Sequence, residues 1–381
     1  MVATVPSMIG QFNMNNIKIL LDLGYKVDVA ANFFDRSVWP EERVQLFKNQ
    51  MNELGIECIQ LFFSRNPLKI FSLIKSYKET ISLLKERNYS FIHTHTPIAS
   101  AIVRIAAKKT GTKVIYTAHG FHFYSGAPLL NWIIYYPIEK LLSKYTDVMI
   151  TINREDYNRA LKKFKAKKTV YIPGVGVDTE KFVPRKDGRE RIRKELGITD
   201  DSFLICSVGE LNKNKNHSVI IKALGKLNDC KIHYVIAGRG ILQHKLKKMI
   251  HHLKLEHTVH LLGFREDIPD LYAASDLCVF PSIREGLGLA AIEGMAAALP
   301  LLVSNNRGMR DLIKEKNVFS CNYNDVTGFS KFIYMLKNDE KLRYEQSRTN
   351  QIVCKEFDCK VVNQKMFEIY SMVKMKGNEY E

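Results

Sequence analysis

FIHTHTPIASAIVRIAAKKTGTKVIYTA, residues 91–118, predicts a strand, a helix and a second strand in immediate succession. Phe91–His95 and Lys113–Ala118 are short runs rich in β-branched and aromatic residues, and Pro97–Lys109 has the pattern of a helix. This β-α-β order predicts a parallel, doubly wound sheet. Ligands bind such a sheet at the carboxyl ends of its strands, where His95 and His119 stand.

The same alternation continues on both sides of this stretch. Before residue 173 we expect further strands at Lys26–Ala30, Asp147–Ile152 and Lys168–Ile172, and helices at Asn13–Leu23, Leu129–Lys144 and Arg154–Phe164. A second array has strands at Ser202–Val208, Ile232–Ala237, Val259–Leu262, Leu277–Phe280, Leu301–Ser304 and Val318–Cys321. Turn-forming residues 173–178 and a charged connector holding Pro184 separate the arrays. We predict two α/β domains, residues 1–183 and 184–360, with the C-terminal helix 361–381 able to pack on either.

The composition is that of a globular protein of 381 residues, with 46% hydrophobic and 25% charged residues. No apolar run approaches the roughly 18 residues of a spanning helix, and Met1–Pro6 shows no secretory signal. Seven scattered cysteines without metal-ligand spacing indicate reduced thiols. We therefore expect a cytoplasmic protein, soluble or peripheral on the inner face of the cell membrane.

The formal net charge of +17 fits nucleic acid, an anionic membrane or a phosphorylated substrate as partner. Between Arg65 and Lys113 there are ten Lys or Arg and only two acids. In Pro67–Arg87 these basic residues alternate with apolar ones, as in a helix that lies on anionic lipid. A surface helix with solvated lysines is the other interpretation, and the pattern leaves both open.

A second segment, FPSIREGLGLAAIE at Phe280–Glu293, has the residues that a nucleoside diphosphate needs. Gly286 and Gly288 let the backbone approach a ligand, and the free N–H groups of a helix start suit a diphosphate. Glu285 in the turn can reach sugar hydroxyls. Glu293, further along the helix, offers two oxygens to the adjacent hydroxyls of a ribose. A solvent-exposed pair of glutamates on an Ala-rich helix is the other interpretation.

The Glu-x7-Glu spacing of this segment resembles that of family 4 retaining glycosyltransferases with the GT-B fold, especially those that assemble bacterial surface polysaccharides. The resemblance covers nearly the whole chain. The similar segments are Thr117–Phe121 (T-x-H-G), Ser207–Leu211 with Lys215 (the phosphate loop), Ala237–Gly240 (a small-residue turn), Leu262–Asp267 and Asp276. Each segment is weak alone, but the ordered set is specific. It implies two Rossmann-like domains whose parallel sheets face each other across a cleft, with acceptor on the first and donor on the second.

The resemblance also implies residue roles. Glu285 would contact the donor sugar, Lys215 would pair with the diphosphate, and His119 would lie near the reacting sugar. His95 is a candidate for acceptor binding. Donor-binding positions would be Gly10, Gly209, Lys213, Gly238, Arg265, Gly286, Leu287, Gly288, Leu289 and Glu293. A histidine satisfied by backbone and an exposed lysine are the alternative interpretations of His119 and Lys215.

The chain departs from the family pattern in its phosphate loop. The family usually has arginine after the loop glycine, whereas Glu210 follows Gly209 here. Since an acid cannot neutralise a diphosphate, Lys213 or Arg307 is expected to supply the second cation.

The N-terminus departs as well. Family members usually open with a full strand and a glycine-rich loop, but here only Val2–Val5 precede Pro6–Gly10. We expect a short first strand and a loop with one glycine.

The alternating pair His93 and His95 invites a metal interpretation, because alternate residues of a strand share a face. No third ligand has a useful spacing, so a structural or ligand-contacting pair is favoured over zinc. The resemblance implies that no cofactor or divalent metal is needed.

These features together predict a retaining glycosyltransferase. The expected donor is a UDP-sugar, and the expected acceptor is a saccharide linked to polyprenyl diphosphate at an anionic membrane. One rival is a nucleotide-sugar epimerase of the same double fold, which would release epimerised sugar. The other is a basic nucleic-acid-binding protein, although the chain lacks a known reading motif.

Overall fold

The structure is a computed structural model that describes residues 1–183, 186–314 and 317–375. The chain forms two compact units, an N-terminal unit of Met1–Val175 plus the chain from Val362, and a C-terminal unit of Gly176–Val361. The division lies after Val175, a little before the boundary expected at 183/184. Pro184 of the expected connector lies outside the described residues.

The N-terminal unit is built on parallel strands. They are β1 (Asp28–Ala31), β2 (Glu57–Gln60), β3 (Phe91–His95), β4 (Lys113–Ala118), β5 (Val148–Thr151) and β6 (Lys168–Tyr171). β1 pairs with β2, and β3 to β6 pair in chain order. The expected first strand is reduced to a single bridge at Val2, which contacts Ala30 on one side and Thr94 on the other. Val2 and its neighbours thus fill the space between β1 and β3.

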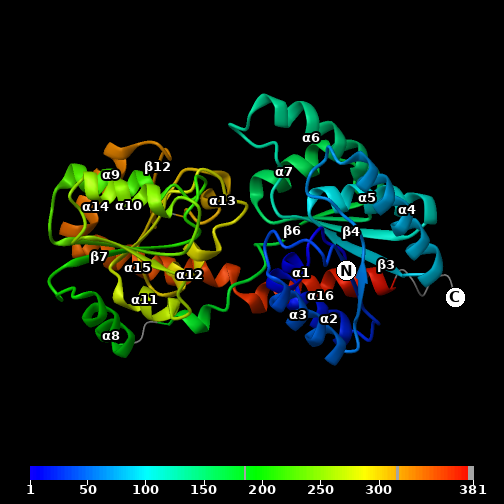
Figure 1. The fold of residues 1–381 in the computed structure, drawn as a ribbon, viewed down its shortest axis with the longest axis horizontal. Helices are drawn as coiled ribbons and strands as arrows, with labels where there is room; N and C mark the ends of the chain where they lie inside the picture. Colours follow the sequence, from blue (N-terminus) through cyan, green and yellow to red (C-terminus); the bar gives the residue numbers. More distant parts are fainter. Residues whose placement is uncertain (184–185, 315–316, 376–381) are drawn as a thin grey trace. The chain divides into compact units, whose positions relative to one another are not determined.

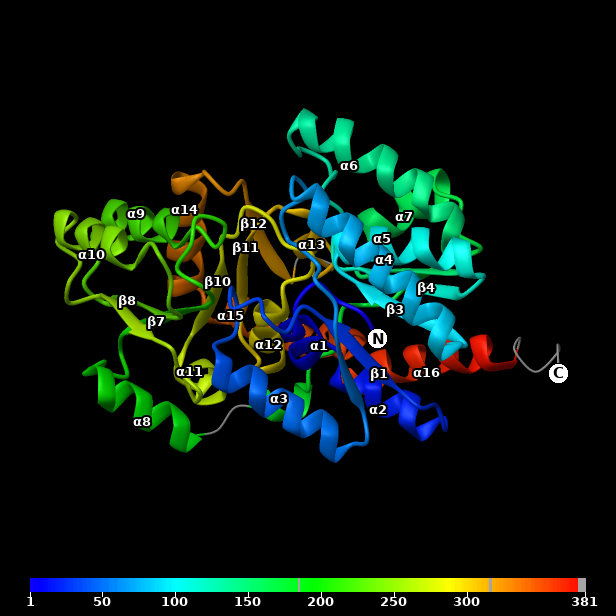
Figure 2. The same cartoon turned by 45° about the vertical axis from the view of Figure 1, so that its right-hand side comes forward.

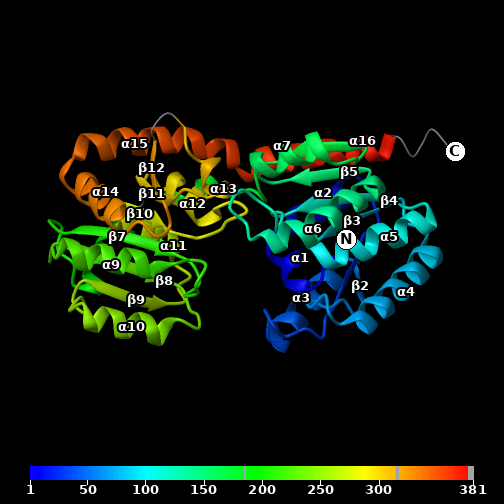
Figure 3. The same ribbon diagram turned by 90° about the horizontal axis from the view of Figure 1, so that it is seen from above.

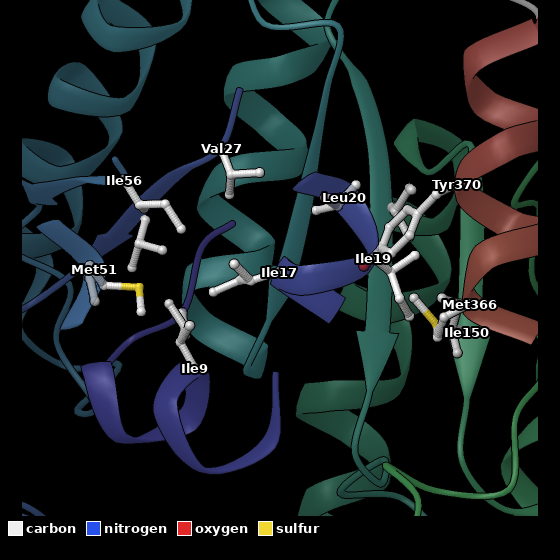
Figure 4. Packing of buried hydrophobic residues seen from close by; sticks show 14 of the residues in the cluster. Ile9, Ile17, Ile19, Leu20, Val27, Met51, Ile56, Ile150, Met366 and Tyr370 are labelled. Carbon is white, nitrogen blue, oxygen red and sulfur yellow. The ribbon is translucent and has the colours of Figure 1, made fainter. Parts of the chain in front are cut away.

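Helices cover both faces of this sheet (Figure 1). One face carries α4 (Ile70–Arg87), α5 (Pro97–Thr110), α6 (Leu129–Leu142) and α7 (Arg154–Lys163). The other carries α1 (Pro6–Phe12), α2 (Met14–Asp22), α3 (Glu41–Glu53) and α16 (Cys359–Met375). Figure 4 shows α16 contributing Met366 and Tyr370 to the same core as Ile19 and Ile150. The C-terminal helix therefore belongs to the N-terminal unit.

Gly10 does not lie in a loop, contrary to the expectation. Pro6 occupies the first position of α1, where its fixed φ favours helix and its missing N–H costs nothing. Gly10 lies inside this helix, and a Cβ there would overlap the buried ring of Trp39 and approach Phe47 Cδ2 to 3.1 Å. Gly10 is therefore a packing position inside a helix, which corrects the expected loop, while its contact with the donor stays a prediction.

The C-terminal unit is a six-stranded parallel sheet in the order β12-β11-β10-β7-β8-β9, visible in Figure 3. Its strands are β7 (Phe203–Val208), β8 (Ile232–Ala237), β9 (Val259–Gly263), β10 (Leu277–Phe280), β11 (Leu301–Ser304) and β12 (Val318–Cys321). Its helices are α8 (Lys186–Leu196), α9 (His217–Leu227), α10 (Gln243–His252), α11 (Ile268–Ala274), α12 (Leu289–Ala296), α13 (Arg307–Arg310), α14 (Val326–Asn338) and α15 (Glu340–Val353). The loops after β7 and β10 are neighbours because these strands pair.

Among the described helices, none has the length and apolar character needed to cross a bilayer.

Candidate active site

The loops after β7 and β10 meet at an ion pair between two residues predicted to be catalytic. Lys215 Nζ lies 2.7 Å from Glu285 Oε1, and both side chains are largely shielded from solvent. The aliphatic stem of Lys215 lies 3.3 Å from the place of a Cβ on Gly209, so glycine there leaves room for the lysine. The chain thus brings together Lys215, Gly209 and Glu285 from two loops.

Asn214 fastens these two loops to each other. Its backbone oxygen accepts from Ile283 N (2.7 Å), its Oδ1 accepts from Arg284 N (3.1 Å), and its Nδ2 donates to Arg284 O (2.9 Å). Three hydrogen bonds to consecutive residues fix the backbone before Glu285. Sequence reasoning missed Asn214, and its polar character inside the phosphate loop was the available signal.

The turn from Glu285 to Gly288 begins α12. Gly288 is the N-cap of this helix, and its carbonyl accepts from Ala291 N and Ile292 N. The first N–H groups of a helix carry partial positive charge and suit an anion. Leu287 is buried, which anchors the turn to the unit's interior. The predicted diphosphate cradle therefore has its expected backbone, a glycine-bearing turn that leads into a helix.

Arg307 lies against the same turn. The side chain is buried, and its Nε approaches Glu285 O to 3.4 Å. A Cβ on the next residue, Gly308, would lie 2.8 Å from Glu285 O, so glycine lets α13 pack closely on the turn. Glu210 is exposed, and its carboxylate accepts from Asn212 Nδ2 at 2.9 Å. The structure therefore places one of the two suggested cations, Arg307, beside Glu285.

Glu293 lies on α12 one helical turn beyond its start. Burial raises the pKa of this carboxyl, and a hydrogen bond from Tyr272 partly offsets that effect. Tyr272 Oη lies 3.3 Å from Glu293 Oε2 and 2.9 Å from Ala290 O. The tyrosine orients the carboxylate, which can accept hydrogen bonds from a diol. Tyr272 comes from α11, and nothing in its local sequence pointed to this role.

Gly238 also supports the phosphate loop. A Cβ at this position would overlap the carbonyl of Gly209, and Gly238 N donates to Gly263 O at 2.7 Å. Glycine therefore allows the turn after β8 to lie directly under the loop after β7. Gly238 is thus a positioning residue for Gly209. The exposed Lys213 lines a pocket of ≈ 530 Å³ with residues of α9 and α10, including Lys222 and Lys245.

Arg265 lies away from the Lys215–Glu285 pair, at the end of edge strand β9. Its guanidinium bonds both oxygens of Glu195 (2.5 and 3.0 Å) and both oxygens of Asp267 (2.8 Å each). The bonds from Arg265, together with one from Arg191, lower the pKa of Asp267 to about 2. In this structure the guanidinium forms ion pairs with two carboxylates, and the expected contact of Arg265 with the donor stays a prediction.

The N-terminal unit holds a cluster of three histidines at the carboxyl ends of β3 and β4. His95 Nδ1 lies 3.1 Å from His119 Nε2, and His93 bonds Tyr370 Oη (2.7 Å) and Thr117 Oγ1 (2.8 Å). Burial lowers the pKa of His119 to about 4 and the pKa values of His93 and His95 well below their usual range. His119, the one partly exposed ring of the three, can therefore exchange hydrogen bonds with a hydroxyl or phosphate oxygen as a neutral imidazole near neutral pH.

The hydrogen bonds of the histidine rings are made inside the unit. Within residues 1–183, 186–314 and 317–375, no group of three or more His, Cys, Asp or Glu side chains is arranged to hold a metal ion. The ring centroids of His93 and His95 are 4.2 Å apart, and both rings have hydrogen-bond partners inside the unit.

Comparison with known proteins agrees with this geometry. Residues 11–181 match the family description "Glycosyltransferase Family 4", and residues 188–351 match "Glycosyl transferases group 1". A putative glycosyltransferase of Bacillus subtilis, EpsD, is 34% identical over 97% of this chain and 95% of its own. The UDP-Gal:alpha-D-GlcNAc-diphosphoundecaprenol alpha-1,3-galactosyltransferase of Escherichia coli is 33% identical over 75% of this chain and 77% of its own.

The fold is shared with solved structures. Anabaena Alr3699/HepE, crystallised in complex with UDP, superposes with a TM-score of 0.77, covering 97% of this chain and 99% of that one at 20% identity. At this identity the likeness concerns the fold alone. Sequence, fold and the loops around Lys215 and Glu285 lead to one conclusion: the chain belongs to the family 4 glycosyltransferases and has the GT-B fold.

Proposed function

We propose that this glycosyltransferase moves a sugar from a UDP-sugar to a saccharide carried on polyprenyl diphosphate, with the anomeric configuration retained, in the synthesis of a surface polysaccharide. The observation that carries the proposal is the Lys215–Glu285 pair at the turn before α12. It sets a cation, a carboxylate and a helix start side by side, the groups that a sugar diphosphate needs. The Escherichia coli relative, whose name gives UDP-Gal as the donor and a GlcNAc on diphosphoundecaprenol as the acceptor, supports the choice of donor and acceptor.

The donor would be held along α12. The amides from Gly286 to Leu289 would bind the diphosphate, and Glu293 would accept from the ribose hydroxyls. Lys215 and Arg307 would supply the positive charge that an arginine at position 210 would otherwise give. Once the diphosphate also binds the ammonium of Lys215, the carboxylate of Glu285 would contact the sugar.

The proposed reaction occurs on one face of the sugar. The bond from sugar C1 to the diphosphate oxygen breaks, and an acceptor hydroxyl oxygen bonds to C1 from the same side. The hydroxyl proton passes to an oxygen of the departing diphosphate. Lys215, Arg307 and the α12 amides would stabilise the negative charge on UDP. His119 would donate a hydrogen bond near the reacting sugar, and no divalent metal would be required.

The acceptor side of the proposal is supported by a pocket of ≈ 400 Å³ in the N-terminal unit. Its lining is largely apolar, and it includes Thr96 and Pro97 at the start of α5, Arg65, His122 and Tyr135. A helix start and an arginine suit phosphate, and apolar walls suit an isoprenoid chain.

Calorimetric titration with UDP and a panel of nucleotide sugars tests the donor assignment. We expect UDP to bind, and Glu293→Ala to weaken binding about 10- to 100-fold because hydrogen bonds to a charged group are lost. Glu345→Ala, at an exposed position of α15, is the matched control and should bind as the wild type does. If the folded protein binds no nucleotide or nucleotide sugar, the proposal fails.

A further inference from the structure

Helix α6 exposes an apolar face. Leu130, Ile134, Pro137 and Leu141 follow one another at i, i+4, i+7 and i+11, which places them along one side of the helix. All four are exposed, with 63% of Leu130 and 53% of Leu141 accessible. Leu129, Ile133 and Ile138 widen the exposed strip. A surface helix normally shows polar residues on its outer side, so this exposed apolar strip indicates an interaction surface.

The orientation of α6 is fixed by its opposite side. Glu139 is buried, and its carboxylate bonds Arg104 Nη1 of α5 at 2.9 Å and Tyr116 Oη of β4 at 3.2 Å. Trp132, Tyr135 and Tyr136 pack on the core beside it. Rotating α6 to bury the leucines would leave Glu139 or Arg104 as an unpaired charge, which is costly. The buried contacts on the opposite side of α6 therefore hold the apolar strip facing outward.

Lysines border the strip. Lys140 and Lys144 are exposed at the end of α6 and just after it. On α7, Arg159 lies over the ring of Trp132 at 4.9 Å from its centroid. Lys162 and Lys163 follow Arg159 by three and four residues, share its side of α7 and are exposed. The apolar strip thus has positive charge beside it.

We propose that the outer face of α6 is a docking surface for an anionic lipid bilayer, with the leucines and isoleucines inserted among the acyl chains and the lysines at the headgroups. Apolar insertion together with basic residues is the combination that holds a helix in a membrane interface. A second copy of the chain fits less well, because it would bring the same lysines face to face. α6 can lie in the interface without crossing it.

The docking surface adjoins the pocket in the N-terminal unit. Tyr135 of α6 lines one wall, and Arg65 and Pro67, just before α4, line another. Leu68, Ile70 and Phe71 at that second rim are strongly exposed. α5 packs between the two helices, and Figure 2 shows the three together. Docking would bring the pocket mouth to the bilayer, and its use for a lipid-linked acceptor rests on the proposed function.

Vesicle flotation of the full-length protein tests the docking surface. Wild-type protein should float with phosphatidylcholine vesicles that contain phosphatidylglycerol. Leu130→Glu/Leu141→Glu should bind at least about tenfold less, because two inserted side chains become charged. Leu46→Glu/Ile352→Glu is the matched control, since both residues are 68% exposed on other helices and the charge change is equal. The control should bind like wild type, and equal loss in both variants would overturn the proposal.

A second variant separates insertion from simple charge attraction. Leu130→Lys/Leu141→Lys adds positive charge to the same positions, and we expect it to bind less tightly than wild type because insertion is lost. Tighter binding would show that the lysines act alone and would contradict docking through α6. Circular dichroism should show that all variants fold.

Two further measurements show whether the strip binds a bilayer or a second copy of the chain. They also separate membrane docking from the proposed function. Concentration-dependent dimers that disappear in Leu130→Glu/Leu141→Glu, without vesicle binding by wild type, would make the strip a dimer interface and refute membrane docking. The same variant should retain transfer to a water-soluble, short-chain acceptor. Loss of flotation with this transfer intact isolates docking, whereas flotation by a wild-type protein without transfer activity would refute only the proposed function.

Discussion

At the scale of single residues, the site depends on how Lys215 is held. A lysine beside the proposed diphosphate site must be positioned yet able to bind the ligand. Glu285 holds its ammonium at 2.7 Å, and Asn214 fixes the backbone of both loops. The pair is partly shielded, so its attraction is stronger than that of a surface pair.

Because Lys215 and Glu285 act as a unit, their substitutions should not be additive. We expect Lys215→Met and Glu285→Gln each to lower kcat/KM about 10²- to 10³-fold, through lost stabilisation of the departing diphosphate and of the sugar. The double variant should lose far less than the product of the two effects. Steady-state kinetics of the four proteins measures this coupling. Strictly multiplicative losses would mean that the residues act independently.

Glu285 and Glu293 could be assigned together because they are close in sequence. Glu285 and Glu293 share one segment, and their spacing showed both in one pattern. Tyr272 and Asn214 reach the same segment from 21 and 70 residues away. Their roles depend on strand order and loop packing, which no local pattern contains. The ion pair of Arg265 was likewise not visible in a local pattern, because its carboxylate partner Glu195 is 70 residues distant.

At the scale of helices and strands, periodic patterns were informative and polar elements were missed. β3 and β4 match their expected ranges, and α5 extends one residue further than expected. The sequence pattern did not reveal α3, β2 or α8. α3 has only three buried residues, and β2 is largely polar, so tertiary contacts outweigh their weak periodicity.

The packing of Gly10 against Trp39 makes a prediction for helix α1. Gly10→Ala should destabilise the protein by about 1–3 kcal/mol, because the new methyl overlaps the Trp39 ring in a packed core. Trp39→Phe in the same chain should recover part of this loss. Denaturant unfolding measures both, and calorimetry should find UDP affinity unchanged. A stable Gly10→Ala protein that no longer binds UDP would place the glycine at the donor site.

The histidine cluster between β3 and β4 should make the N-terminal unit sensitive to acid. Burial lowers the pKa of His119 from 6.5 to about 4, so between these values the unfolded chain binds more protons than the folded one. The free energy of unfolding therefore has its full value above about pH 6.5. It falls as the pH drops toward 4, by up to about 3 kcal/mol for this residue. His119→Gln should lose less stability than wild type between pH 7.5 and pH 5, roughly, in urea unfolding. Equal losses in both proteins would contradict this cause.

At the scale of the whole molecule, the chain forms two α/β units with parallel sheets, as predicted. The sequence pattern left open which unit the C-terminal helix packs on. Residues 361–374 are amphipathic and suited either unit. The hydrogen bond between His93 and Tyr370 joins positions 277 residues apart and shows that α16 belongs to the N-terminal unit. Sequence periodicity predicts that a helix has an apolar side, but only the folded structure shows which residues pack on that side.

The central claim is that this molecule transfers a sugar and keeps its anomeric configuration. The most direct measurement is to incubate the purified protein with a panel of UDP-sugars and a polyprenyl-diphosphate-linked saccharide, to find the product by mass spectrometry and to determine its anomeric linkage by NMR. We predict an acceptor extended by one sugar, with the anomeric configuration of the donor. An inverted linkage, or free UDP and epimerised sugar without extended acceptor, would contradict the account.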